Sequence, residues 1–147
     1  MPGVSIYIIA YLGATERAEL LKSVCENALA MDYPEFEVIV SDNAGPLRVE
    51  EALRSIRDPR LKVFRNEENL GFAGNFNTCL ERCSHDIIKF NCDDDLLHPD
   101  FLKLTVPLVD DETFVVSNYE KYVIGKPPAA LSEPMPRKPD VEILQPG

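Results

Sequence analysis

The chain has 147 residues, of which 45% are hydrophobic and 27% are charged, with seven glycines and twelve prolines. These values are typical of one globular domain that buries a core without disulfides to hold it together. Fifteen lysines and arginines stand against twenty-five aspartates and glutamates, which gives a net charge of -10. Because such a field repels phosphate backbones and anionic lipid, we expect no nucleic-acid partner.

The sequence holds no apolar run close to the roughly 18 to 20 residues that a membrane-spanning helix needs. Its first residues, MPGVSIYII, lack the basic flank and the cleavage site of a signal peptide. We therefore expect a cytoplasmic protein without a transmembrane segment.

The cysteines, Cys25, Cys79, Cys83 and Cys92, are spaced too irregularly for a disulfide scaffold, so free thiols are expected. Cys79 and Cys83 lie four residues apart on a predicted helix, and with His85 and Cys92 they allow a zinc cluster as one interpretation. The sequence contains no C-x-x-C pair. Buried apolar thiols are therefore the interpretation that we favour.

Runs of apolar and β-branched residues alternate along the chain with stretches of helical periodicity. Strands are expected at residues 4–9, 36–40, 61–64 and 86–90. Helices are expected from Thr15, as the cap, to about Leu29, from Gly45-Pro46 to Asp58-Pro59, from the segment 66–75 to about Cys83, and from about Pro99. The order strand, helix, strand, helix, strand, helix, strand is typical of right-handed crossovers.

This order predicts an α/β fold with a Rossmann-like, mostly parallel sheet and helices on both faces. A further strand is expected near residues 113–117, TFVVS. Residues 126–147 hold six of the twelve prolines and almost no periodic apolar pattern, so an irregular Pro-rich tail is predicted there. The expected organisation is a domain over residues 1–125 followed by this tail.

Chemistry-bearing residues follow the predicted strands, and ligands of open parallel sheets bind outside the carboxyl ends of the strands. The first strand ends at Ala10 and Tyr11, the second at Asp42 and Asn43, and the fourth just before residues 93–95. The ring of Tyr11 can stack on a nucleobase. The carboxylate of Asp42 can accept the imide N–H of uracil, which cytosine does not offer.

Asp93, Asp94 and Asp95 are adjacent carboxylates that repel one another unless a hard cation binds their oxygens. A divalent ion would let this acidic protein hold a diphosphate and would act as a Lewis acid. A solvated acidic turn before Pro99 is the other interpretation, and the spacing alone does not choose between them. His98 is interpreted either as a metal or phosphate ligand or as a helix-flanking histidine.

The segment NLGFAGN at residues 69–75 places small residues and Asn side chains at a strand-to-helix turn. Exposed amides at Asn69, Gly71 and Asn75 can face an anionic ligand there. The segment has neither the ending of a Walker loop nor the spacing G-x-G-x-x-G. A plain turn and helix start is therefore the alternative interpretation.

Four segments in one order carry a resemblance to a known family. They are VSIYIIAY at 4–11, EVIVSDNAG at 37–45, NEENLGFAGNFN at 66–77 and IIKFNCDDDLLHPDFL at 87–102. They resemble the amino-terminal half of family 2 glycosyltransferases, enzymes of the GT-A fold, over about residues 3–105. The resemblance implies a sugar-nucleotide donor, most often a UDP-sugar, bound with Mn²⁺ or Mg²⁺ and used to glycosylate a hydroxyl with inversion.

Carried over by position, the resemblance implies that Tyr11 and Asp42 hold the base and that Asp93 approaches the ribose or the sugar. It implies that Asp94, with Asp95 beside it, meets the metal. Ala10, Asn69, Gly71 and Asn75 complete the expected nucleotide-binding set.

The chain departs from the family's pattern at several positions. Ile9 and Ala10 stand where members often have Pro and Thr, Leu12 where Asn is common, Gly74 where many have Arg, and Cys92 at the first aspartate of the D-x-D form. These departures bear on nucleotide preference, and Cys92 shifts the acidic cluster one residue toward the following helix.

No residue matches the family's catalytic base, and the available carboxylates Asp110, Asp111 and Glu120 are left unassigned. Two hypotheses follow. The chain is the nucleotide-binding half of a glycosyltransferase that acts on a saccharide or lipid-linked acceptor, or it is a non-catalytic module that binds a nucleotide sugar or a protein. Apolar sheet surface left uncovered would favour a homo-oligomer.

Overall fold

In a computed structural model of the protein, residues 1–117 are described, and Met1–Val115 form one compact unit. Within this unit the strands form a parallel sheet in the order β3-β2-β1-β4. The strands are β1 (Val4–Ala10), β2 (Phe36–Asp42), β3 (Leu61–Arg65) and β4 (Ile87–Cys92). All three pairings between neighbouring strands are parallel, as the sequence predicts.

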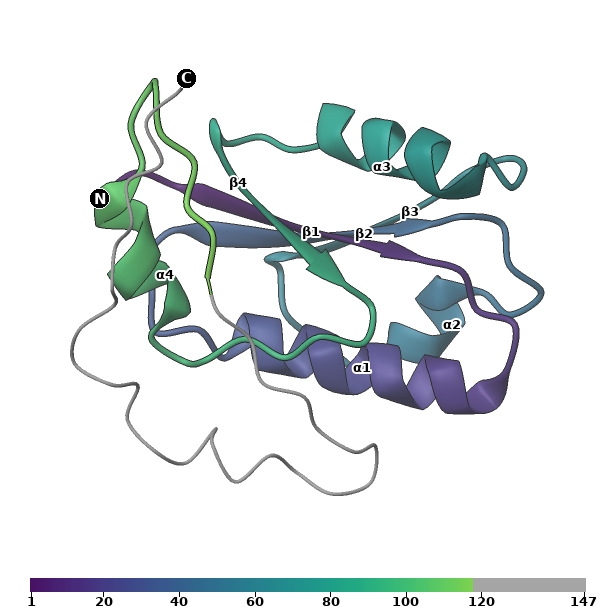
Figure 1. Cartoon of the computed structure of the whole chain (residues 1–147). Coiled ribbons are helices and arrows are strands. Elements are labelled where there is room, and N and C mark those ends of the chain that lie inside the picture. The colour runs from purple at the N-terminus through teal and green to yellow at the C-terminus, as the bar shows by residue number, and fades with distance from the viewer. Residues whose placement is uncertain (118–147) are drawn as a thin grey trace. The chain divides into compact units, whose positions relative to one another are not determined.

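Helices cover both faces of the sheet (Figure 1). They are α1 (Thr15–Leu29), α2 (Val49–Leu53), α3 (Gly71–Glu81) and α4 (Phe101–Thr105), which continues into the short 3₁₀ helix η1 (Val106–Leu108). Figure 1 shows α3 on one face and α1 and α2 on the other. The predicted α/β fold with helices on both faces is confirmed.

The alternation of side chains along the strands divides the apolar residues between two clusters. Ile6 and Ile8 of β1 belong to a large cluster with residues of α1, α2 and α4. Tyr7 and Ile9 belong to a smaller cluster with Cys79 of α3. A strand that is buried on both faces needs a continuous apolar run, which explains why β1 was predicted so directly from its sequence.

Three local predictions are wrong. The helix predicted from Gly45-Pro46 to Asp58-Pro59 spans only Val49–Leu53. Ala14, with extended φ and ψ of -151° and 159°, is the N-cap of α1, and Thr15 is the first helical residue. The strand expected at 113–117 does not form: Thr113 makes only an isolated antiparallel bridge with Asp110. Phe114 and Val116 are 80% and 77% exposed, and among the described residues this run joins no sheet.

The predicted boundary at residue 125 and the tail at 126–147 lie outside the described residues and stay predictions. None of the helices within residues 1–117 combines the length and the apolar character that crossing a bilayer requires.

The cysteines are free thiols, and Cys25 and Cys79 are buried, as the sequence predicts. Burial raises the pKa of both thiols to about 12, so they stay protonated. The zinc interpretation is not supported within residues 1–117, because the group of possible metal ligands found there does not include Cys79, Cys83 or His85.

Glu37 of β2 lies buried in a network of hydrogen bonds. Its carboxylate accepts from the Ser5 hydroxyl at 2.6 Å, from the Ser84 hydroxyl at 2.6 Å and from the Lys62 ammonium at 2.6 Å. Burial opposes ionisation, but these donors outweigh it and hold the pKa of Glu37 at about 2. Glu37 therefore stabilises the folded chain as a carboxylate.

Glu37→Gln is expected to flatten the dependence of stability on acid. The folded pKa of about 2 lies below the ordinary value of 4.5, so this stabilisation is complete above pH 4.5 and is lost as the pH falls toward 2. The loss amounts to about 3 kcal/mol. Urea unfolding at a series of pH values from neutral to acid measures it. Equal slopes for the parent and the variant in this window would contradict the prediction.

Candidate functional site

The carboxyl ends of β1, β2 and β4 meet at one edge of the sheet. Ala10 is the register partner of Asp42, and Ile9 is the register partner of Cys92. The chain runs from β1 to β2 on one side and returns to β4 on the other, so this edge contains the point where strand order reverses. Ligands of open α/β sheets bind at such points.

An open cavity of about 510 Å³ lies at this edge. Its lining comes from the strand ends, from the first turn of α1 and from the start of α3. The lining residues are Ile9, Ala10, Tyr11, Arg17, Asn43, Asn69, Gly71, Phe72, Asn75, Cys92, Asp93 and Asp94. A second hollow of about 170 Å³ lies between β4 and the segment from α4 onward, and most of its lining residues are apolar. The aspartates and asparagines at the strand ends place the candidate site in the larger cavity.

The cavity brings together most of the predicted site residues. Ala10, Tyr11, Asn69, Gly71, Asn75, Asp93 and Asp94 line it, whereas Asp42 and Asp95 do not. The sequence places Asn43 at the end of the second strand but assigns it no site role, and it gives no indication of Arg17 or Phe72. Asn43 follows Asp42 directly, so the rule of strand ends applies to it as well, but no local signal marks Arg17 or Phe72.

Aromatic rings stand at the surface of the cavity. Tyr11 is 47% exposed and Phe72 is 67% exposed. Tyr11 follows β1 directly, and Phe72 is the second residue of α3. Exposed rings that line a cavity offer flat apolar surface on which a nucleobase can stack.

Asp42 is buried at the end of β2, where its side chain is 1% exposed. Its Oδ2 accepts hydrogen bonds from the Val49 backbone N–H at 3.1 Å and from the Arg65 guanidinium at 2.7 Å. Arg65 also donates to the Gly45 carbonyl, which fixes the guanidinium. Within residues 1–117, Oδ1 of Asp42 is a buried side-chain atom without a hydrogen-bond partner. A buried carboxylate oxygen with free acceptor capacity is costly unless a ligand donates to it.

Asn side chains fix the turn from β3 into α3. Asn43 donates to Asn69 Oδ1 at 2.8 Å and accepts from the Leu70 backbone N–H at 2.9 Å. Asn75 accepts from Asn66 at 2.8 Å and donates to a backbone carbonyl of β2. The turn therefore arises from side-chain hydrogen bonds that tie α3 to the end of β2.

Gly71 is the first residue of α3 and has a φ of +69°. Residues with a side chain rarely adopt this conformation, so the turn favours glycine. The amides of Asn69, Gly71 and Asn75 thus build the wall of the cavity, and their contact with a ligand stays a prediction.

Arg17 bridges two of the aspartates. Its guanidinium donates to Asp93 Oδ1 at 2.5 Å and lies 3.4 Å from Asp94 Oδ2. The side chain of Asp93 is 14% exposed, and burial raises its pKa above the ordinary value although Arg17 and its hydrogen bond oppose the shift. The side chain of Asp94 is 49% exposed. The two carboxylates thus differ in environment, because Asp93 is largely buried while Asp94 is half exposed.

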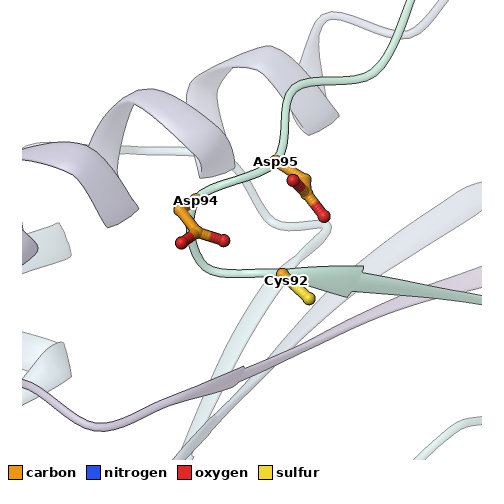
Figure 2. Close-up of side chains that lie close together, drawn as sticks. All are labelled: Cys92, Asp94 and Asp95. Carbon is orange, nitrogen blue, oxygen red and sulfur yellow. The ribbon is translucent and has the colours of Figure 1, made fainter. Parts of the chain in front are cut away.

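Cys92, Asp94 and Asp95 form a group in which one possible ligand atom from each residue lies within 4.8 Å of the others. Figure 2 shows Cys92 at the end of β4 and Asp94 and Asp95 on the turn that follows. The donor set fits a divalent cation, because two carboxylates supply the hard oxygen ligands that Mn²⁺ and Mg²⁺ prefer. Burial and the neighbouring carboxylates raise the pKa of the Cys92 thiol to about 11.

Other candidates lie away from this group. His98 Nδ1 accepts a hydrogen bond from the Asp100 backbone N–H at 3.2 Å, which fits the helix-flanking interpretation. Asp110 and Asp111 are exposed near the end of the compact unit. Glu120 lies outside the described residues. We assign no catalytic base among residues 1–117.

Comparison with known proteins identifies the family. Residues 5–144 match the family described as glycosyl transferase family 2, and the chain belongs to this family. A comparison with curated proteins finds no match.

Solved structures share the fold. The mannosyltransferase PcManGT from Pyrobaculum calidifontis, in complex with GDP-Man and Mn²⁺, is 27% identical with a TM-score of 0.66, covering 75% of this chain and 33% of that chain. S. aureus TarS 1-349 is 23% identical with a TM-score of 0.62, covering 71% and 31% respectively. A structure of TarS 1-349 in complex with UDP gives a TM-score of 0.63 at 23% identity, with the same coverage of both chains.

These neighbours are glycosyltransferases of the GT-A fold, so the predicted fold class and family are confirmed. The chain spans about a third of the length of these structures.

Proposed function

We propose that the chain is the nucleotide-binding half of a glycosyltransferase that uses a UDP-sugar as donor with a divalent metal ion. The observation that carries this proposal is the cavity at the strand ends, where exposed rings, the buried carboxylate of Asp42 and the aspartates after β4 lie at one edge. The match to the family and the neighbours with GDP-Man and Mn²⁺ or with UDP support it.

Tyr11 and Asp42 recognise the base in this proposal. The exposed ring of Tyr11 stacks on the uracil, and the unpartnered Oδ1 of Asp42 accepts the imide N–H. Arg65 holds Asp42 through Oδ2, so the carboxylate keeps its orientation when the base leaves. Asp93 contacts the ribose or the sugar.

Asp94, with Asp95 and Cys92 beside it, would hold the metal ion. When bound, the metal neutralises the two phosphoryl groups and stabilises the negative charge of the departing diphosphate.

The acceptor is a hydroxyl group of a saccharide or of a lipid-linked saccharide, and transfer proceeds with inversion. A base removes the proton of the acceptor hydroxyl, the oxygen attacks the anomeric carbon, and the bond to the diphosphate breaks. The described residues contribute the donor side of this reaction. They orient the sugar nucleotide and exclude the wrong base.

The second candidate function is a non-catalytic module that binds a nucleotide sugar. The departure at Gly74 of α3 favours it, because family members often carry Arg at this position. A Cβ at Gly74 would lie 2.7 Å from the Leu70 Cβ, so this position has no room for a larger side chain unless Leu70 moves. Release of UDP from a UDP-sugar by this chain would exclude the second candidate.

Calorimetric titration with UDP is expected to show binding that Mn²⁺ strengthens by about tenfold or more, because charge-assisted contacts to a diphosphate need the cation. CDP is the matched control, since cytosine lacks the imide N–H, and it is expected to bind more weakly. GDP tests the nucleotide assignment. Tighter binding of GDP than of UDP would overturn the choice of uridine, and no heat with any nucleotide would overturn the proposed function.

A further inference from the structure

Arg17 is the one cationic residue among the described residues that line the cavity. It lies in the first turn of α1 and reaches across to the turn after β4, which is 76 residues further along the chain. Its side chain is 40% exposed, so water and ligands reach the guanidinium. A single positive group therefore stands where two carboxylates and the proposed diphosphate meet.

The two contacts of Arg17 differ in strength. The distance to Asp93 Oδ1 is 2.5 Å, and Asp93 is the more buried partner. The distance to Asp94 Oδ2 is 3.4 Å, and that carboxylate is half exposed. A long contact between exposed charges is weak and exchanges readily. Arg17 can thus leave Asp94 while Asp93 keeps it at the cavity.

A divalent ion and the guanidinium repel each other, so they compete for the oxygens of Asp94. A guanidinium released from Asp94 retains several N–H donors in a planar fork, which matches the oxygens of a phosphate group. Because the other charged residues lining the described cavity are acidic, Arg17 is also the side chain there that can attract an anion.

We propose that Arg17 is a positioning residue that exchanges partners. It pairs with Asp94 when no metal ion is bound, and it contacts the diphosphate of the donor when a metal ion binds Asp94. This inference rests on the proposed function. Arg17 is not among the positions to which the family resemblance assigns a role. The exchange keeps Asp94 paired with a cation in both states, first with Arg17 and then with the metal.

The exchange predicts effects of opposite sign for one substitution. Arg17→Gln removes the competitor, so the affinity for Mn²⁺ alone is expected to rise about twofold to fivefold. The same variant loses a charge-assisted contact, so the affinity for UDP at saturating Mn²⁺ is expected to fall about tenfold or more. Isothermal calorimetry measures both constants on the same preparation.

Lys22→Gln is the matched control, because it makes the same charge change on the same helix, where Lys22 lies 3.9 Å from Glu26. It reports the long-range effect of one lost charge and is expected to change either affinity by less than about twofold. Arg17→Lys keeps the charge but loses the fork, so it is expected to recover UDP affinity only in part. This variant also keeps the test valid if Arg17→Gln folds poorly.

Two results would overturn the inference. One is that Arg17→Gln has the same affinities as Lys22→Gln in both titrations. The other is that Arg17→Gln lowers the affinity for Mn²⁺ and the affinity for UDP together. Failure of the proposed function looks different, because the unmodified chain then binds neither Mn²⁺ nor UDP.

Discussion

Asp94→Asn is expected to abolish the part of UDP binding that depends on Mn²⁺, with a loss of about 100-fold or more in affinity. Removing a group that merely supports a metal ligand already costs 10- to 100-fold, and removing a ligand costs at least as much. Asp94 lines the cavity and belongs to the group with Cys92 and Asp95. Its substitution is therefore expected to weaken the binding of both the metal ion and the diphosphate. Titration with UDP at saturating Mn²⁺ gives the affinity.

Stability separates loss of binding from loss of fold. The side chain of Asp94 is half exposed and carries one of several adjacent negative charges, so the free energy of unfolding without metal is expected to change by less than about 0.5 kcal/mol. Mn²⁺ with UDP should then raise the melting temperature of the parent but not of the variant.

Asp86→Asn is the matched control for Asp94→Asn. Asp86 is exposed just before β4, whereas Asp94 follows that strand, so the two substitutions make the same charge change at opposite ends. We expect Asp86→Asn to bind UDP and Mn²⁺ like the parent. If Asp94→Asn keeps the parent's metal-dependent affinity, the metal assignment at this turn is wrong.

The two central strands could be predicted because both of their faces are buried. β1 is apolar apart from Ser5, and β2 is apolar up to Val40 apart from Glu37, so the apolar run itself marks both strands. The predicted end of β2 at residue 40 is early, because Ser41 and Asp42 are polar although they continue the ladder to Phe64 and Arg65. The apolar run stops before the polar residues at the end of the strand, so hydropathy does not predict the last residues of such a strand.

The segment at 113–117 shows where local sequence misleads. TFVVS has strand propensity, but a strand also needs a neighbouring strand with free backbone groups, and local sequence does not contain that information. Phe114 remains 80% exposed within the described residues. The predicted N-cap of α1 is also wrong. The extended conformation falls on Ala14 and not on Thr15, although Thr is the better capping residue.

The sequence likewise predicts only part of the candidate site. Tyr11, Asp42 and the aspartates after β4 follow from strand order alone, since parallel strands end at one edge. Arg17 reaches Asp93 across 76 residues of sequence, and the Arg65 contact with Asp42 crosses 23. Neither arginine belongs to a motif. Partners of this kind depend on how the helices and strands pack, so sequence reasoning found the acids and missed their cations.

Asp42→Asn is expected to destabilise the fold by about 3 kcal/mol. Removing one partner of a buried ion pair costs about 3 to 5 kcal/mol, and the lower value applies because the side chain of Arg65 is 29% exposed. The Val49 backbone N–H also donates to the carboxylate, and an amide nitrogen at that position could not accept from it. Urea unfolding measures the change.

Asp58→Asn is the control for that loss of stability. Asp58 pairs with Arg60 at 2.7 Å, but their side chains are 22% and 40% exposed, so the expected cost is below about 1 kcal/mol. Equal destabilisation by the two substitutions would show that burial does not set the cost at Asp42.

The nucleotide preference tests the second role of Asp42. In the parent, Oδ1 is proposed to accept the imide N–H of uracil, and cytosine offers no such donor. Asp42→Asn weakens that acceptor and removes its charge, so the affinity for UDP is expected to fall about tenfold or more while the affinity for CDP changes little. The ratio of the two affinities is unaffected by partial unfolding, because unfolded protein binds neither nucleotide. A preference for UDP over CDP that survives in the variant would therefore remove Asp42 from base recognition even if the stability loss is observed.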